Sequence, residues 1–275
     1  MINEILIYND YGSSEFCVEQ LFKCFKLIYT NKELTIKKIN AKQIIEDDIL
    51  ADREQTKLLC LGGGFDLGYM KSLTEIGMAK IKRFVESGGN YLGICAGAYF
   101  ACNYVEFDLN GKLEVIGERY LKFFNGKSIG PLNKHFIYNS DDEALAIGIK
   151  INDNLNYVFL NGGCQFVPYD DDDSNENYKI IAHYCDLDKQ DQTKLHDSLS
   201  LIKNEKIAIV ETKNKNGKCL LSGVHFEINS FDLDKNNENV KLNLIDRLKS
   251  INDNNYEHSN YDLVKHLFKN SFNLD

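Results

Sequence analysis

The sequence has no tryptophan, two prolines, and no Cys-x-x-Cys pair among its eight cysteines. Its longest apolar runs, such as "LLCLG" at residues 58–62, have the length of a strand and fall far short of the ~18 residues of a membrane span. The chain shows neither a secretory hydrophobic segment nor a transit-type leader. These absences predict a cytoplasmic protein with reduced thiols and no membrane partner.

A surplus of basic residues is also lacking, because 32 Lys and Arg stand against 41 Asp and Glu, a net charge of −9. Nucleic-acid binding requires a concentrated basic face, so we expect no nucleic-acid partner. The scattered cysteines do not have zinc-ligand spacing. The acidic run at Tyr169–Tyr178 lacks the Gly and distal Glu of an EF-hand loop, which favours a solvated turn over a calcium site. We therefore predict no metal.

The first half of the chain alternates between apolar strand-like runs and helix-like runs. Strands are expected at residues 4–9, 34–39, 57–61 and 90–95, and helices at 13–29 and 70–89. This rhythm predicts an α/β fold with a mainly parallel central sheet and helices on both faces. The apolar stripe of the second helix is predicted to be Ile76, Met78, Ile81, Phe84 and Val85.

The second half shows shorter strand-like runs separated by Asn- and Asp-rich loops. From residue 236 onward the pattern predicts two polar helices joined by a loop. We therefore divide the chain into a domain at residues 1–235 and a helical extension at 236–275, packed on that domain or following it.

The stretch "YLGICAGAYF" at residues 91–100 places Cys95 between Gly93 and Gly97, where a strand turns into a helix. A residue at such a turn is held in a strained conformation at the carboxyl edge of the sheet, and the helix N-terminus favours a thiolate. Cys95 is thus a candidate nucleophile. The alternative is a thiol that packs as a small apolar residue, with the glycines making only the turn.

A thiol nucleophile needs a base and a group that orients the base. His225 and Glu227 follow an apolar run, and two-residue spacing places their side chains on one face of an extended segment. The alternatives for the base are His135 and His183. Gly62, Gly63 and Gly64 end an earlier strand, where bare N–H groups can approach a ligand.

Several segments, taken in order, resemble the amidotransferase-like N-terminal domain of eukaryotic biotin-protein ligases, within the class I glutamine amidotransferase superfamily. They are "LGGGFDLGYMKSL", "FVESGGNYLGICAGAYFAC", "LKFFNGKSIGP", "YVFLNGGCQFV" and "LLSGVHFE". The resemblance implies a flavodoxin-like three-layer sandwich. It also implies that Cys95 is the nucleophile, His225 the general base and Glu227 the orienting carboxylate.

Further site residues follow from the same resemblance. The backbone N–H groups of Gly63 or Gly64, with that of Ala96, would form an oxyanion hole. The remaining pocket residues are expected to be Asp66, Tyr99, Asn161, Gly162 and Gly163. The partner is then a small amide, as substrate or ligand, and a second expected partner is a biotin ligase catalytic domain.

The sequence departs from the family pattern in two places. The glutamine that usually follows the nucleophile motif is replaced by Ala98 and Tyr99, and the usual His-Pro-Glu reads His225-Phe226-Glu227. We therefore expect poor hydrolysis of free glutamine. Tyr99 either narrows the pocket or packs away within the helix.

No biotin-adenylate loop and no cofactor fingerprint are present in the 275 residues, so we expect no cofactor and no biotinylation by this chain itself. Two functions remain open: a cysteine amidase or amidotransferase, and a non-catalytic regulatory or ligand-binding module associated with protein biotinylation.

Overall fold

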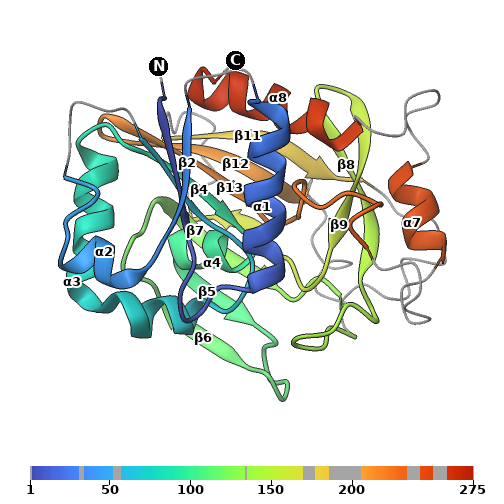
Figure 1. Cartoon of the computed structure of the whole chain (residues 1–275). Coiled ribbons are helices and arrows are strands. Elements are labelled where there is room, and N and C mark those ends of the chain that lie inside the picture. The colour runs from blue at the N-terminus through green and yellow to red at the C-terminus, as the bar shows by residue number, and fades with distance from the viewer. Residues whose placement is uncertain are drawn as a thin grey trace.

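The computed structural model describes residues 2–30, 34–51, 57–133, 135–169, 177–185, 206–233, 242–249 and 259–274. A 13-stranded sheet forms its centre (Figure 1). One half of the sheet is parallel and contains, in spatial order, β2 (Thr35–Ile39), β1 (Glu4–Tyr8), β3 (Lys57–Leu61), β4 (Asn90–Ile94) and β13 (Gly217–Ser222). This half contains the four strands that the first part of the sequence predicts.

The other half is mostly antiparallel, although β5 and β7 pair in parallel. Beyond β13 follow β12 (Ile207–Asn214), β10 (Gln165–Pro168), β7 (Phe124–Gly130), β5 (Cys102–Phe107) and β6 (Val115–Glu118). A branch from β12 leads through β11 (Tyr178–Tyr184) and β8 (Leu145–Ile151) to β9 (Asn154–Leu160). The predicted α/β fold with a large central sheet is confirmed.

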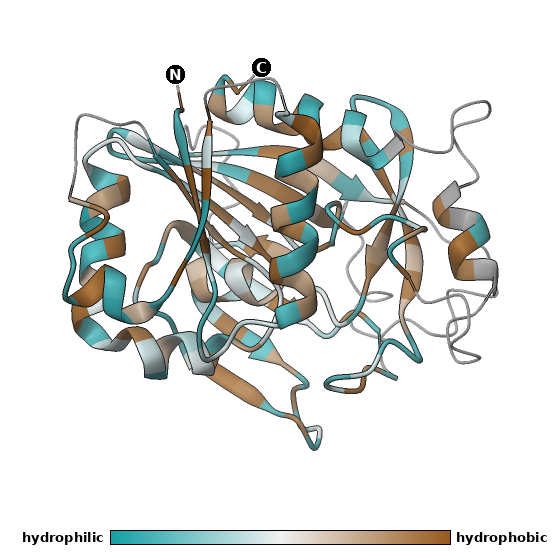
Figure 2. Ribbon diagram, viewed as in Figure 1, coloured by the Kyte–Doolittle hydropathy of each residue, from teal (hydrophilic) through white to brown (hydrophobic). Residues whose placement is uncertain are grey.

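Helices cover both faces of the parallel half because its strands are apolar on both sides. Ile5 and Ile7 of β1 belong to a cluster with α1 (Glu15–Ile28) and α8 (Ser259–Phe272). Leu6 and Tyr8 belong to the cluster that includes residues of α2 (Ala41–Ile45), α3 (Asp66–Glu86) and α4 (Ala96–Ala101). In Figure 2 the central strands are mostly brown, whereas α1 alternates between teal and brown, as an amphipathic helix does.

The helix α3 corrects one sequence prediction. Ile76, assigned to the apolar stripe, is 58% exposed, whereas Leu73, Met78 and Ile81 are buried. Ile76 lies two residues before Met78, which is about 200° around a helix, so its side chain points away from the face that Met78 and Ile81 bury. The helix is also interrupted at Thr74, whose φ of 54° and ψ of 179° are not helical.

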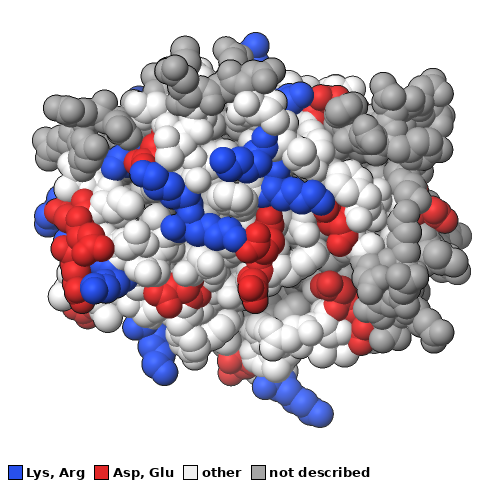
Figure 3. Space-filling model, viewed as in Figure 1, with Lys and Arg blue, Asp and Glu red and all other residues white. Residues whose placement is uncertain are grey.

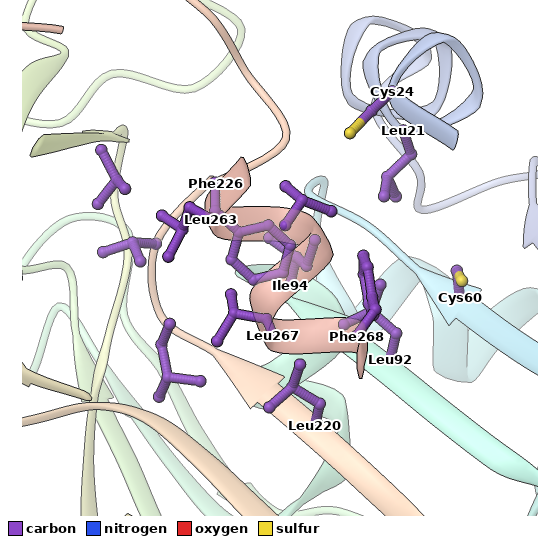
Figure 4. Close-up of a cluster of buried hydrophobic side chains, with 14 of the residues drawn as sticks. Leu21, Cys24, Cys60, Leu92, Ile94, Leu220, Phe226, Leu263, Leu267 and Phe268 are labelled. Atoms are coloured by element: carbon purple, nitrogen blue, oxygen red, sulfur yellow. The ribbon is translucent and has the colours of Figure 1, made fainter. Parts of the chain in front are cut away.

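The two predicted C-terminal helices are present as α7 (Leu242–Lys249) and α8. They were predicted to be polar, but α8 inserts Leu263, Leu267 and Phe268 into the core beside α1 (Figure 4). The division of the chain at residue 235 stays a prediction. Of the acidic run at 169–178, residues 170–176 lie outside the described residues.

On the face that carries α1 and β2, lysines lie beside acidic side chains, as Figure 3 shows. Lys23 pairs with Asp232, and Lys37 pairs with Glu4 at 2.7 Å. Among the described residues, no helix is long and apolar enough to cross a membrane.

Candidate active site

Cys95 lies in the sharp turn between β4 and α4. Its φ of 50° and ψ of −109° are strained for a residue with a side chain, and its N–H is fixed by a 2.8 Å hydrogen bond to the Ser222 carbonyl. A Cβ at Gly93 would lie 2.6 Å from the Gly97 carbonyl oxygen, and a Cβ at Gly97 would lie 2.0 Å from that of Leu61. The two glycines therefore let the elbow pack closely, and the half-buried Cys95 borders a cavity.

The cavity has a volume of about 460 Å³. It lies where α1 and α4 begin, at the carboxyl ends of β3 and β4, which is a usual place for a ligand in an open α/β sheet. Every predicted site residue except Glu227 borders it, namely Cys95, His225, Gly63, Gly64, Ala96, Asp66, Tyr99, Asn161, Gly162 and Gly163. The structure thus brings together residues that are far apart in the sequence.

His225 and Glu227 lie in the segment after β13, which ends at Ser222, and so not on a regular strand. The His225 N–H donates to the Phe159 carbonyl at 2.9 Å, which anchors this segment to β9. Nδ1 of His225 and Oε1 of Glu227 are 2.7 Å apart, and both side chains are buried. The bond fixes the ring orientation, while the second oxygen of Glu227 has no hydrogen-bond partner among the described residues.

The charge state of His225 follows from its surroundings. Burial alone would lower its pKa, but the negative charge of Glu227, the Cys17 thiol and a hydrogen bond with Cys95 raise the pKa well above the usual value near ~6.5. These interactions favour the protonated form of the imidazole. Neither His135 nor His183 belongs to the described cavity lining.

The backbone N–H groups of Gly63, Gly64 and Ala96, all residues of the cavity lining, make no backbone hydrogen bond within the part of the chain that the structure describes. Gly64 has a φ of +146°, and a Cβ there would lie 2.0 Å from the Gly12 carbonyl oxygen. A Cβ at Gly63 would lie 2.8 Å from Cε1 of His225. Glycine is therefore required for the loop to lie this close to the histidine.

Tyr99 was predicted either to narrow the pocket or to pack away within the helix, and it does some of both. It is 4% exposed and packed edge-to-face against Phe107 at 5.7 Å, yet it borders the cavity. Its hydroxyl donates to the Gly163 carbonyl at 2.5 Å, which links α4 to the second glycine loop. In the same loop the Asn161 carbonyl accepts from the Cys95 thiol at 3.9 Å, a long contact.

Asp66 begins α3 and is bound by a residue that the sequence did not indicate. Nε of Arg119 donates to Oδ2 of Asp66 at 2.6 Å, and both side chains are largely buried. The Arg119 guanidinium also donates to the carbonyls of Gly117 and Glu118. The carboxylate of Asp66 is thus neutralised by a cation that does not itself border the cavity.

The sequence also did not indicate Cys17, which borders the cavity from α1. Burial raises its pKa to about 11. Its sulfur, a ring nitrogen of His225 and an oxygen of Glu227 lie within 4.8 Å of one another, and these residue types can hold a transition metal. Because Glu227 already bonds Nδ1 of His225, we assign it to orienting the ring. A single cysteine within a helical run carries no signal that would have revealed this position.

No sequence pattern indicated Phe107, Phe136 and Tyr138 either, which are three aromatic residues of the cavity wall. They come from β5 and from the loop between β7 and β8. Their ring centroids are 4.9–6.0 Å apart. Only the packing of these elements against α4 places them beside the elbow.

The chain is similar in sequence to a protein family and to two individual proteins. The chain matches the family described as biotin-protein ligase, N terminal, over residues 3–272. It is 30% identical over 250 residues to the biotin–protein ligase of Schizosaccharomyces pombe, an alignment that covers 88% of this chain and 36% of that ligase. The chain therefore spans about a third of the length of the ligase.

A protein of Chlamydia muridarum described as uncharacterized is 30% identical over 230 residues, covering 82% of this chain and 81% of that protein. Among solved structures, a putative ThuA-like protein from Bacteroides uniformis shares 13% identity at a TM-score of 0.48, covering 91% of this chain and 92% of that chain. The extent of the family match is decisive: this chain belongs to the biotin-protein ligase N-terminal family.

Proposed function

We propose that Cys95, His225 and Glu227 are a catalytic triad that cleaves or transfers a small amide through a thioester, on a flavodoxin-like fold of the class I glutamine amidotransferase type. One observation carries this proposal. The strained Cys95 and the Glu227-oriented His225 meet at one cavity with the free N–H groups of Gly63, Gly64 and Ala96. A merely structural thiol has no need of this combination.

The chemistry divides into two steps. The Cys95 sulfur, as thiolate, attacks the amide carbonyl, and the carbonyl π electrons move onto oxygen. The protonated His225 then donates its proton to the leaving nitrogen as the C–N bond breaks, which releases an amine or ammonia and leaves a thioester. His225, now neutral, takes a proton from water as water attacks the thioester, and the acid product leaves with the thiolate restored.

Glu227 and the N–H groups support these steps without changing covalent bonds. Glu227 stabilises the imidazolium and holds the other ring nitrogen toward Cys95. The N–H groups of Gly63 or Gly64 and of Ala96 stabilise the oxyanion that forms in each step, and such donors typically contribute about 10²–10³-fold in rate.

A non-catalytic module that binds a ligand, associated with protein biotinylation, is the second candidate. The observation that favours it is Tyr99, which matches the usual substrate-binding glutamine but uses its hydroxyl on the Gly163 carbonyl. The S. pombe relative is a biotin–protein ligase, so a ligase catalytic domain is the partner we propose for such a module. If this second candidate is right, the Cys95→Ala protein still binds both the ligand and the ligase catalytic domain.

Site-resolved alkylation with iodoacetamide tests the triad. Cys185, the other described thiol that is not fully buried, serves as a reference within the same molecule. We expect Cys95 to react at least about tenfold faster than Cys185 at pH 7, because Cys95 borders the cavity beside His225, which would activate its sulfur. His225→Asn should abolish this difference. If Cys95 in the wild type reacts no faster than Cys185, the nucleophile assignment is refuted.

A further inference from the structure

The cavity has two chemically different sides. Tyr99, Phe107, Phe136 and Tyr138, here called the aromatic wall, form a continuous series of ring contacts. Val115 also borders this side of the cavity. The wall is fixed in place, because Tyr99 is hydrogen-bonded to the Gly163 carbonyl and Phe107 contacts the three other rings. Such a wall presents flat apolar surface to whatever occupies the cavity.

The charge of the lining is the second observation. Glu15, Asp66 and Asp141 border the cavity, whereas no Lys or Arg of the described residues does. Asp66 is neutralised from behind by Arg119. The carboxylates of Glu15 and Asp141 remain, so a ligand carboxylate would meet like charge and find no lysine or arginine there.

The orientation of a substrate follows from the position of His225. Its proton must reach the leaving nitrogen, so this nitrogen lies on the side of His225 and Cys17 of α1. The aromatic wall belongs instead to the α3 and α4 side of the sheet, where Tyr99 and Phe107 join the core cluster of that face. The acyl group therefore extends from Cys95 over the aromatic wall.

Tyr138 supports the closeness of this wall to the elbow. Burial raises its pKa to about 12, and the charges of Asp66 and Cys95 contribute to the same direction. The phenol is therefore within electrostatic range of the nucleophile and stays neutral at physiological pH.

We infer that the substrate is an amide whose acyl group carries a flat, apolar ring and no negative charge. Cleavage of such an amide rests on the proposed function, whereas its binding in the cavity does not. It excludes free glutamine for a reason separate from the substitution at Ala98 and Tyr99: the α-carboxylate of glutamine finds no lysine or arginine among the described lining residues, and the charge of His225 is already paired with Glu227.

Three primary amides test the inference: 3-phenylpropanamide, butanamide and 4-carbamoylbutanoate. The first carries a ring, the second neither ring nor charge, and the third a carboxylate. Ammonia release gives kcat and KM for each, and calorimetry with the Cys95→Ala protein gives binding without reaction. We expect the phenyl amide to have the lowest KM and Kd and the carboxylate to show no saturable binding.

Variants of the wall supply the matched comparison. Phe136→Ala should weaken binding of 3-phenylpropanamide about three- to tenfold, and more than it weakens binding of butanamide, which has no ring to contact the wall. Ile137→Ala is the control, because Ile137 is adjacent, 51% exposed and absent from the cavity lining. A cooperative urea transition shows that the Phe136 variant is folded.

The outcomes separate the two proposals. If the Cys95→Ala protein binds the phenyl amide but the wild type turns over no amide, the triad proposal fails and the inference stands. If 4-carbamoylbutanoate or butanamide is processed as well as the phenyl amide, the inference is overturned while the triad proposal survives.

Discussion

Replacing Glu227 by Gln removes one buried negative charge from the site and leaves its shape nearly unchanged. In the wild type, Oε1 of Glu227 is 2.7 Å from Nδ1 of His225, and both side chains are at most 3% exposed. Hydrogen bonds to charged groups contribute about 1.5–3 kcal/mol to stability. We therefore expect Glu227→Gln to lower the free energy of unfolding by about 2–3 kcal/mol at pH 6.

The loss should shrink as the pH rises. The pKa of folded His225 lies above its unfolded value, so its stabilisation is complete below pH ~6.5 and disappears as the pH passes the folded pKa. Without the Glu227 charge, burial lowers the pKa of His225, and the folded variant binds about one proton fewer. The stability difference between the proteins should therefore fall by up to about 1.4 kcal/mol per pH unit.

Urea denaturation of both proteins at pH 6, 7 and 8 measures this difference. Glu4→Gln is a matched control at the opposite end of the sheet. Burial would raise the pKa of Glu4, but Lys37 and Lys57 lower it, so the carboxylate keeps its charge throughout this pH range. Its stability loss should be independent of pH. A Glu227→Gln loss that stays constant or grows with pH would refute the buried ion pair.

Other substitutions test the packing. Phe268→Ala should cost about 3–5 kcal/mol in urea denaturation, because the ring is fully buried; a loss below about 1 kcal/mol would show that α8 is not part of the core. Gly97→Ala should lower the melting temperature, because the new Cβ would lie 2.0 Å from the Leu61 carbonyl oxygen; an unchanged melting temperature would contradict this close packing. Tyr99→Phe should cost about 1 kcal/mol by removing the hydrogen bond to Gly163; an equal or higher stability would show that this bond contributes nothing.

Much of the parallel core was predictable from the sequence because the signals are local. Apolar runs indicated β1, β3 and β4, and glycines follow β3 and precede β4. The elbow at Cys95 was predictable for the same reason, because Gly93 and Gly97 each lie only two residues from Cys95 in the sequence. Such patterns depend on backbone sterics and two-residue periodicity.

Two predictions about helices failed. Ile76 was assigned to the buried stripe of α3 although it lies two residues before Met78, about 200° around the helix. The segment of α8 was predicted to be polar, although its buried residues Val264, Leu267 and Phe268 recur at helical spacing. Only the packing of α8 beside α1 shows that this stripe is part of the core.

The sequence by itself determined which residues have the chemistry: a thiol at an elbow, a histidine two residues before a glutamate, and two glycine loops. Tertiary structure alone decided that the thiol, the histidine and the glycine loops share one cavity, that Arg119 neutralises Asp66, and that Cys17 and the aromatic wall complete the lining. The reason is physical. A nucleophile is marked by local backbone constraint, whereas the lining of a cavity is assembled from side chains on elements that meet only when the sheet and its helices pack.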